Sequence, residues 1–267
     1  KDHVLIPELD KMLESYYAFV TQQSWFAELV NDLEQIIAEV ENRVDDSFLV
    51  RLYCRLARTD YYLNGPRGNA PATFQKSYEL ALTVENEVEV GHALHGLAAC
   101  HMVSDWDTCI DLLQQCITTY QNAGDEVHAA LAKNTLAESY RFLGRSDETG
   151  VLFEESYRVL KEVNDSRFLT PLRKVAQNYT EDGDYQAARD LYNEYLDITD
   201  RIGGIHTKVF VLQGLGRIAF LTENYEEAKA YYEDAWILSQ QSIPSRMAII
   251  GLARIATKQE DYKQAIE

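Results

Sequence analysis

The chain has few basic residues for its number of acids. It carries 25 Lys and Arg residues against 43 Asp and Glu residues, which gives a formal net charge of -18. A surface with this excess of negative charge repels the phosphate backbone of nucleic acids and the headgroups of anionic membranes. We therefore expect no nucleic-acid partner and no membrane partner.

The sequence also lacks segments that would carry the chain into a membrane. It has no run of about 18 apolar residues, the length that indicates a transmembrane helix. The stretch Lys1-Asp2-His3-Val4-Leu5 has neither the charged nor the apolar region of a signal peptide.

The four cysteines, Cys54, Cys100, Cys109 and Cys116, form no CxxC pair. This favours small core residues in a reducing compartment over a redox or metal role. We expect a cytoplasmic protein.

Motifs of common catalytic and ligand sites are absent. The chain has no glycine-rich phosphate loop, no GxSxG, no HExxH and no EF-hand loop. His92 and His95 share a helix face, but no Cys or acid stands at ligand spacing there, which favours a polar surface over a metal site. Paired acids such as Glu154-Glu155 indicate a solvated face rather than acid–base catalysis. We expect no enzyme activity, cofactor or metal.

What the sequence does have is a repeat of about 40 residues. A small residue that follows a turn recurs with gaps of 39, 40, 39, 40 and 37 residues. This anchor column consists of Ala70, Cys109, Thr149, Ala188, Ala228 and Ala265. Self-similarity at such a period indicates a solenoid of stacked repeats.

Each repeat divides into two helical patterns. A large apolar residue followed by a small one marks the first helix, at Leu56-Ala57, Leu97-Ala98, Leu136-Ala137, Val175-Ala176, Leu215-Gly216 and Leu252-Ala253. Gly, Asn or Asp and an aromatic residue stand in the turn before the second helix, which suits a tight helix–helix connection. Apolar residues at i+4 and i+7 from the anchor give the second helix one buried face. The pattern predicts an all-α chain of about six antiparallel helix pairs.

These columns resemble the tetratricopeptide repeat (TPR) family. The match is clearest at Leu215-Gly216, Tyr225, Ala228, Tyr232 and Ala235. The resemblance covers about residues 45–267 and implies a right-handed α-solenoid, a TPR-like superhelix. The period is longer than the family's usual period of about 34 residues. In this it is similar to the repeats of MalT-like regulators, of sensor regions in signal-transduction ATPases and of LGN-like adaptors.

The columns also suggest how the chain is organised. Residues 1–44 carry two further helical patterns, with Ser24 placed to cap the second, and we expect an N-terminal cap or degenerate first repeat there. The tandem repeats are predicted at about 45–86, 87–124, 125–165, 166–203, 204–243 and 244–267, the last one truncated. Because the chain starts without Met and ends partway through a repeat, we expect it to be part of a longer protein.

The resemblance implies that the first helices line a concave groove and contact ligands at four positions each. Those positions hold six Arg, two His and a single acid, Glu138. The candidate peptide-binding residues are Arg51, Arg58, His95, Asn134, Arg141, Arg173, Gln177, Gln213, Arg217, Phe220 and Arg254. A basic stripe in an acidic chain would attract an anionic ligand, and Arg offers paired donors to a carboxylate. Equally open is that these arginines neutralise acids on the second helices of neighbouring repeats.

We expect a protein- or peptide-binding scaffold, a sensor or regulatory segment in signal transduction. Its partner would be an acidic or partly apolar segment of another protein or of another domain of the same full-length chain. Two alternatives stay open. One is a small-molecule, oligosaccharide-like sensor, which a closed cavity lined by Tyr61, His92, His95 and Phe220 would favour. The other is an array that selects substrates for an enzyme whose catalytic part lies outside this chain.

Overall fold

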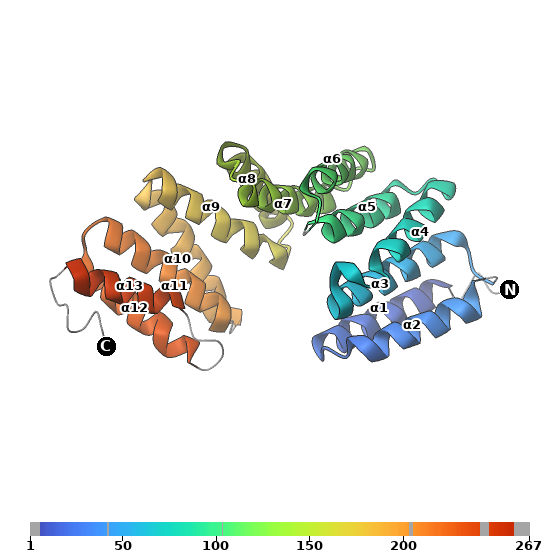
Figure 1. The fold of residues 1–267 in the computed structure, drawn as a ribbon, viewed down its shortest axis with the longest axis horizontal. Coiled ribbons are helices and arrows are strands. Elements are labelled where there is room, and N and C mark those ends of the chain that lie inside the picture. The colour runs from blue at the N-terminus through green and yellow to red at the C-terminus, as the bar shows by residue number, and fades with distance from the viewer. Residues whose placement is uncertain (1–5, 42, 103, 203–204, 241–245, 259–267) are drawn as a thin grey trace. The chain divides into compact units, whose positions relative to one another are not determined.

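The computed structural model describes residues 6–41, 43–102, 104–202, 205–240 and 246–258. Their regular structure is entirely helical, which confirms the predicted all-α class (Figure 1). The α-helices are α1 (Ile6–Gln22), α2 (Phe26–Val40), α3 (Asp46–Asn64), α4 (Ala70–Thr83), α5 (Glu87–His101), α6 (Trp106–Asn122), α7 (Glu126–Phe142), α8 (Ser146–Glu162), α9 (Leu169–Asp182), α10 (Tyr185–Ile202), α11 (Ile205–Leu221), α12 (Tyr225–Ser239) and α13 (Arg246–Lys258). No helix in these ranges is long and apolar enough to cross a membrane.

Consecutive helices form pairs from α3 onward. Each predicted repeat range between residues 45 and 243 contains one pair, and α13 lies in the range 244–267. The anchor residues lie in the first turn of the second helices and are buried, with exposed fractions of 3% or less from Ala70 to Ala228. The last member of the column, Ala265, lies outside the described residues. Small side chains at these positions let the two helices of a pair cross closely.

The turn residues explain where the helices begin and end. Asp105 and Asn224 precede α6 and α12, and each side chain accepts a hydrogen bond from the backbone N–H three residues further on, at 3.1 and 3.5 Å. These contacts satisfy one of the free N–H groups at a helix start. Gly144 and Gly183, which follow first helices, have positive φ angles of 75° and 86°, which glycine adopts without steric cost.

The start of α2 differs from the sequence prediction. Ser24 is predicted to cap this helix, but the N-cap residue is Trp25, which makes no side-chain cap hydrogen bond. Ser24 has a φ of 60° and lies one residue too early. A capping side chain has to reach the N–H of the second or third helical residue, and that requires it to stand directly before the helix. The prediction is wrong at this residue.

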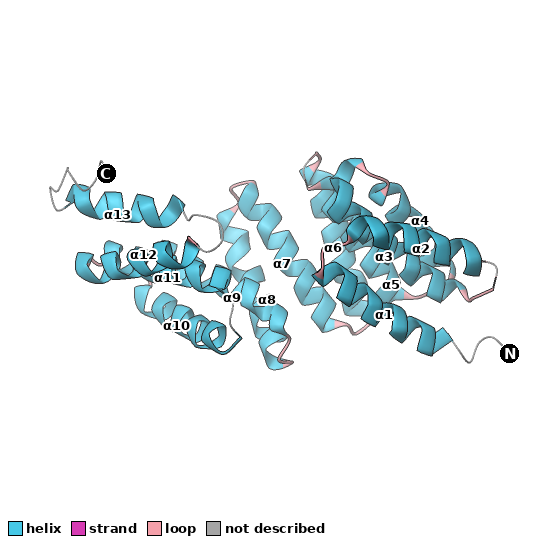
Figure 2. Cartoon of the chain, turned by 90° about the horizontal axis from the view of Figure 1, so that it is seen from below, coloured by secondary structure: helices cyan, strands magenta, loops and turns pink. Residues whose placement is uncertain are grey.

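The chain forms two compact units, Lys1–Leu152 and Phe153–Glu267, which we describe separately. In the first unit, α1, α2 and α3 pack around Leu29, Leu33 and Phe48, all buried completely or nearly so (Figure 2). Further along this unit, Cys116 and Tyr120 of α6 pack against α4, α5 and α7. The core is thus a sequence of layers between neighbouring helices, as expected of stacked repeats.

The second unit is built in the same way. Leu172 of α9, Tyr192 of α10 and Leu215 of α11 belong to one buried cluster. Tyr232 of α12 and Ile255 of α13 continue it towards the C-terminal end of the unit. Each helix therefore buries its apolar face against its neighbours in the chain.

Glycines on first helices face aromatic rings from the preceding second helix. A Cβ atom would lie 2.1 Å from the Phe74 ring at Gly96, 2.3 Å from the Tyr192 ring at Gly214 and 2.5 Å from the Tyr232 ring at Gly251. These distances are far below van der Waals contact. The ring of one repeat thus fits where the next first helix has no side chain, and this contact sets how closely successive repeats approach.

Candidate ligand-binding face

The predicted groove residues fall into two sets, one in each unit. The N-terminal stripe lies on α3, α5 and α7 and consists of Arg51, Arg58, His95, Asn134 and Arg141. The C-terminal stripe lies on α9, α11 and α13 and consists of Arg173, Gln177, Gln213, Arg217, Phe220 and Arg254. We use these two names below.

Contacts between first helices bring the N-terminal stripe onto one face of its unit. The Tyr61 hydroxyl of α3 donates to the Ala99 carbonyl of α5 at 3.3 Å. His95 Nε2 of α5 lies 2.9 Å from Thr135 Oγ1 of α7. Three first helices are therefore in lateral contact, so side chains at matching positions become neighbours.

Arg51 already has acidic partners inside the unit. Its Nε lies 2.8 Å from Asp10 Oδ2 on α1, and one terminal nitrogen lies 3.7 Å from Glu89 Oε1 on α5. The Arg51 side chain is 29% exposed and that of Glu89 only 7%. The guanidinium thus links three helices, and partial burial makes the link stronger than a surface pair.

Arg55 belongs to the same cluster, although the sequence prediction missed it. A terminal nitrogen of Arg55 lies 2.8 Å from the other carboxylate oxygen of Asp10, and the side chain is 17% exposed. Arg51, Arg55 and Arg58 stand at i, i+4 and i+7, which places them on one face of α3. That spacing was a readable signal. It was missed because the groove positions were taken from the repeat register alone.

Arg58 and Asn134 have polar atoms that the described chain leaves unused. Arg58 is exposed, and no carboxylate of the described residues lies within ion-pair distance of it. Asn134 Oδ1 is buried, with no hydrogen-bond partner among the described residues. An accessible guanidinium and an unsatisfied amide oxygen are groups that a bound chain can satisfy, because a buried acceptor without a partner is costly.

His95 is neutral at pH 7. Burial, and to a smaller extent the neighbouring groups Arg58, His92 and His128, lower the pKa of its imidazole to about 4. A neutral ring both donates and accepts one hydrogen bond. His95 therefore contributes a polar contact to the stripe and no charge.

Two further histidines tie α5 to α7. The rings of His92 and His128 meet edge to face, 4.7 Å apart, and Tyr120 stacks on His128 at 5.4 Å. The Nδ1 atoms lie 3.3 Å from Glu89 and 2.7 Å from Asp125. Within the described ranges, no group of three or more His, Cys, Asp or Glu residues could hold a metal ion. The arrangement is a polar contact between helices.

Arg141 forms an ion pair within its own helix. Its guanidinium donates to Glu138 Oε2 at 2.6 and 3.0 Å, an i, i+3 pair in which the Arg141 side chain is 48% exposed. Exposed pairs of this kind contribute only about 0.3–0.5 kcal/mol. A ligand carboxylate can therefore compete for Arg141 at little cost.

In the C-terminal stripe, two arginines lie over aromatic rings of the neighbouring first helix. The Arg173 guanidinium stands 5.5 Å from the centroid of the Phe210 ring, and that of Arg254 stands 4.8 Å from Phe220. No carboxylate in the described part of this unit lies within ion-pair distance of either arginine. A guanidinium stacked on a ring keeps its edge donors for an anion.

Arg217 forms a weaker contact, and Gln177 and Gln213 flank it half-buried. One Arg217 terminal nitrogen lies 3.5 Å from Glu181 Oε1 on α9, with both side chains about half exposed. Such a pair contributes between about 0 and 1 kcal/mol. Gln177 of α9 and Gln213 of α11 are intermediate in exposure, and both occupy predicted ligand positions of their first helices. The Arg217–Glu181 ion pair in this polar part of the stripe is therefore weak.

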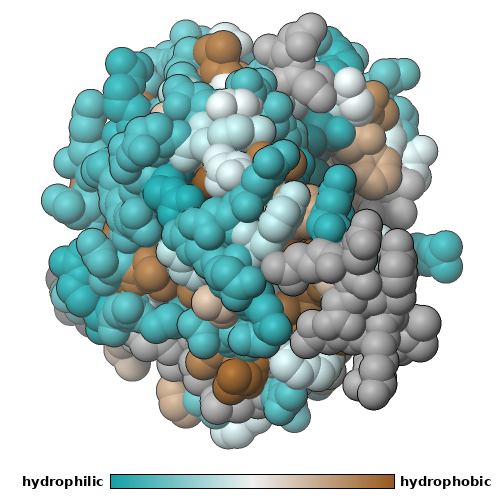
Figure 3. All heavy atoms as spheres, turned by 90° about the vertical axis from the view of Figure 1, so that its left-hand side faces the viewer, coloured by the Kyte–Doolittle hydropathy of each residue, from teal (hydrophilic) through white to brown (hydrophobic). Residues whose placement is uncertain are grey.

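Large apolar side chains stand beside these arginines. Phe210 is 54% exposed, Met247 61% and Ile250 49%. Figure 3 shows a mainly hydrophilic face with separate hydrophobic groups. Exposed apolar side chains next to accessible arginines make the C-terminal stripe amphipathic.

The paired stripe arginines do not use acids of the second helices. Their described partners lie on the first helices α1, α5, α7 and α9. Acids of second helices have bases of their own: Arg189 of α10 pairs with Glu227 of α12 at 2.7 Å, and Lys161 of α8 pairs with Glu194 of α10 at 2.8 Å. Among the described contacts, the stripe arginines therefore form no ion pair with second-helix acids.

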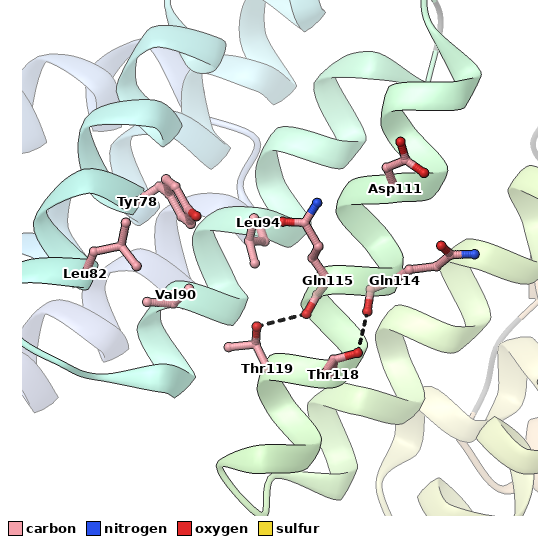
Figure 4. Close-up of a pocket in the computed structure, with 9 residues that line it drawn as sticks. All are labelled: Tyr78, Leu82, Val90, Leu94, Asp111, Gln114, Gln115, Thr118 and Thr119. Carbon is pink, nitrogen blue, oxygen red and sulfur yellow. Dashed lines mark hydrogen bonds between the residues drawn. The ribbon is translucent and has the colours of Figure 1, made fainter.

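A cavity of about 520 Å³ lies elsewhere in the first unit, between α4, α5 and α6 (Figure 4). Its lining residues are Tyr78, Leu82, Val90, Leu94, Asp111, Gln114, Gln115, Thr118 and Thr119. The hydroxyls of Thr118 and Thr119 donate to carbonyls of their own helix at 3.0 and 2.8 Å. None of the lining residues belongs to a stripe or to the set that the small-molecule alternative requires.

Comparison with known proteins places the chain among repeat proteins. A tetratricopeptide repeat family model matches residues 128–201 and 167–236. No curated protein matches the sequence. The matched residues include three of the predicted anchor and turn regions, those of Thr149, Ala188 and Ala228, from α7 to α12.

Solved structures resemble this fold at low sequence identity. A signal-transduction ATPase with a tetratricopeptide repeat sensor from Pyrococcus horikoshii has a TM-score of 0.67 and 15% identity, over 94% of this chain and 39% of that one. NprR in complex with its cognate peptide NprX has a TM-score of 0.65 and 17% identity, over 98% and 75%. A Rap protein complexed with Competence and Sporulation Factor has a TM-score of 0.64 and 13% identity, over 94% and 70%.

The sequence columns, the helix pairs and these comparisons agree with one another. The described anchor residues, Ala70 to Ala228, are buried, and the last three of them lie within the stretch that the family model matches. At such low identities the solved structures show the fold alone, and that fold is the TPR-like α-solenoid. Residues 128–201 and 167–236 thus match the tetratricopeptide repeat family, and the chain has a TPR-like α-solenoid fold.

Proposed function

We propose that this chain binds a segment of a protein along its first-helix stripes, and that the segment carries acidic and apolar side chains. The observation that carries the proposal is the pair of arginines Arg173 and Arg254. Both are stacked on Phe rings of neighbouring first helices, and neither has a carboxylate partner among the described residues.

Charge and shape favour this kind of partner. In a chain with a net charge of -18, accessible arginines concentrate positive potential on one face, which steers acidic segments there. Exposed Phe210 and Met247 stand on the same first helices as stripe residues, so apolar side chains of the segment gain contact area next to the charges. The binding energy would come from many small contacts along the stripe.

The similar structures support a peptide partner. NprR was solved with its cognate peptide and a Rap protein with Competence and Sporulation Factor. The Pyrococcus protein carries its repeats as the sensor of a larger ATPase, of which this chain spans 39%. In line with these, the proposed role is a sensor or regulatory segment, with the partner either a separate protein or another domain of the full-length chain.

Charge reversal tests the proposal. The probe is a short fluorescein-labelled peptide of alternating Glu and Leu, with a Lys–Leu peptide of equal length for comparison. The double variant Arg173→Glu, Arg217→Glu is expected to weaken binding of the acidic probe about thirtyfold, the equivalent of roughly 2 kcal/mol lost at two contacts. Fluorescence anisotropy measures the affinity.

The matched control is the double variant Arg158→Glu, Arg201→Glu. Both residues are exposed in the same unit but on second helices, so the net charge changes equally. The control should weaken binding no more than about threefold, because only the long-range field changes. An equal loss in both variants, or preference for the Lys–Leu peptide, would show that the stripe is not the binding face.

A further inference from the structure

Three arginines of α3 and one aspartate of α1 form a compact charged cluster. The two carboxylate oxygens of Asp10 each contact a different guanidinium: Oδ1 lies 2.8 Å from Arg55, and Oδ2 lies 2.8 Å from Arg51. The Asp10 side chain is 23% exposed and the two arginines 29% and 17%. One Asp10 oxygen thus accepts a hydrogen bond from Arg55 and the other lies within ion-pair distance of Arg51 Nε, which makes no hydrogen bond of its own among the described residues, so two guanidinium groups converge on one carboxylate.

The third arginine, Arg58, is exposed and accessible to a further carboxylate. Arg58 stands one turn beyond Arg55 on the same face of α3, is exposed, and has no carboxylate of the described residues within ion-pair distance. A second carboxylate can therefore bind at Arg58 while Asp10 is still in place.

The helix that supplies Asp10 packs on its unit through both apolar and ionic contacts. Among the described side chains of α1, Leu13 and Val20 are buried and Tyr17 packs against the same cluster, whereas Met12 is 69% and Phe19 52% exposed. Helices at the end of a chain are among the parts of a fold that open at low free-energy cost. The ion pairs of Asp10 add to the apolar contacts that dock α1 on α3.

We propose that Asp10 is an internal occupant of a carboxylate-binding site formed by Arg51, Arg55 and Arg58, and that a carboxylate of the partner segment displaces it. This rests on the proposed function, because the site is the α3 end of the N-terminal stripe. Asp10 is tethered to the site and competes at high effective concentration, so it lowers the affinity for weak anionic ligands. Only a segment that also gains other stripe contacts displaces it.

The test compares Asp10→Asn with Glu14→Gln in the full chain, using the same fluorescent Glu–Leu peptide. Asn keeps the size of the side chain and removes the charge. Glu14 is an exposed acid of the same helix, so its variant matches the change in net charge. Asp10→Asn is expected to bind the probe about tenfold more tightly, as when a site occupied nine-tenths of the time is freed. Glu14→Gln should stay within about twofold.

A second arm locates the gain. In an Arg55→Ala background, Asp10→Asn should no longer tighten binding, because the vacated guanidinium is missing. If Asp10→Asn alone leaves the affinity unchanged or weakens it, Asp10 is only a docking contact of α1 and the inference is wrong. That result is separable from failure of the proposed function, in which Arg173→Glu, Arg217→Glu also has no effect on the probe.

Hydrogen exchange of the unchanged protein covers the case in which Asp10→Asn fails to fold. Displacement of Asp10 releases α1, so saturating Glu–Leu peptide should speed amide exchange in α1 while slowing it in α3. If the peptide binds and exchange in α1 stays the same or slows, Asp10 has not been displaced and the inference is overturned.

Discussion

The imidazole of His95 is half-buried on the N-terminal stripe and hydrogen-bonded to Thr135, with its pKa lowered to about 4 by desolvation and by nearby positive charge. In the unfolded chain a histidine has a pKa of about 6.5. The unfolded state therefore takes up the proton first as the pH falls. Stability from the neutral ring is fully present above about pH 6.5 and is lost as the pH falls towards 4.

The lowered pKa of His95 predicts how the stability of the protein depends on pH. Between about pH 6.5 and 4, His95 should contribute up to roughly 1.4 kcal/mol of lost stability per pH unit. His95→Gln, which retains a hydrogen-bonding side chain, should remove that part of the slope in urea unfolding curves measured at several pH values. His101→Gln, on the same helix, serves as the control. An identical pH slope for both variants would contradict a desolvated, neutral His95.

Single residues also show what the repeat register could not predict. The register placed Arg51 and Arg58 at equivalent ligand positions, yet Arg51 is held by Asp10 and Glu89 whereas Arg58 has no described acidic partner. The difference arises from α1, which lies outside the repeated columns. Whether an arginine is available depends on neighbours distant in sequence, and no periodicity encodes those.

At the scale of the element, the contact between glycine and an aromatic ring sets the spacing of successive repeats. Gly214 and Gly216 lie on the same helix, α11. A Cβ at Gly214 would approach the Tyr192 ring to 2.3 Å, and a Cβ at Gly216 would approach Tyr232 only to 3.1 Å. At both positions, replacing glycine by alanine increases the helix propensity, but the space available for the new side chain differs.

Gly214→Ala should accordingly destabilise the protein by about 1–3 kcal/mol, the usual cost of overpacking a core. Gly216→Ala should cost less, or even stabilise, because alanine favours the helix by about 1 kcal/mol and the neighbouring ring needs to shift only slightly. Urea denaturation followed by circular dichroism measures both. Equal free energies of unfolding for the two variants would show that the Tyr192 contact does not limit the approach of the helices.

The helices themselves followed from the sequence more fully than their ends did. Buried anchor residues and buried residues at i+4 and i+7 recur in the five repeats from Ala70 to Ala235, so the local pattern and the packing agree. Ser24 is the exception, because the backbone turns left-handed there and Trp25 takes the capping position. The conformation of a turn depends on how the two helices pack, which composition does not specify.

At the scale of the whole molecule, the net charge of -18 dominates. Pairs such as Arg189 with Glu227 neutralise only part of the acidic second helices. The remaining like charges repel one another and oppose the compact state. Salt screens this repulsion over a Debye length of about 10 Å at 0.1 M and about 3 Å at 1 M.

Sodium chloride should therefore stabilise the chain. Between low salt and about 1 M, we expect the Tm to rise by roughly 2–4 °C, the shift that about 1 kcal/mol produces in a chain of this size. The double variant Glu233→Gln, Asp234→Asn, which removes two exposed acids of α12, should have a higher Tm at low salt and a smaller salt response. A Tm that falls with salt would mean that favourable ion pairs outweigh the repulsion.

The sequence by itself determined the all-α class, the paired helices and the repeat, because a repeated pattern of small and apolar residues reports directly on contacts made again in each repeat. It also placed a set of arginines on the first helices. Only the tertiary structure decided which of these are engaged: Asp10 holds Arg51 and Arg55, while Arg173 and Arg254 rest on Phe rings with their edges accessible. Electrostatic partners come from any helix that packs nearby, so the availability of a charge is a property of the fold and not of the repeat.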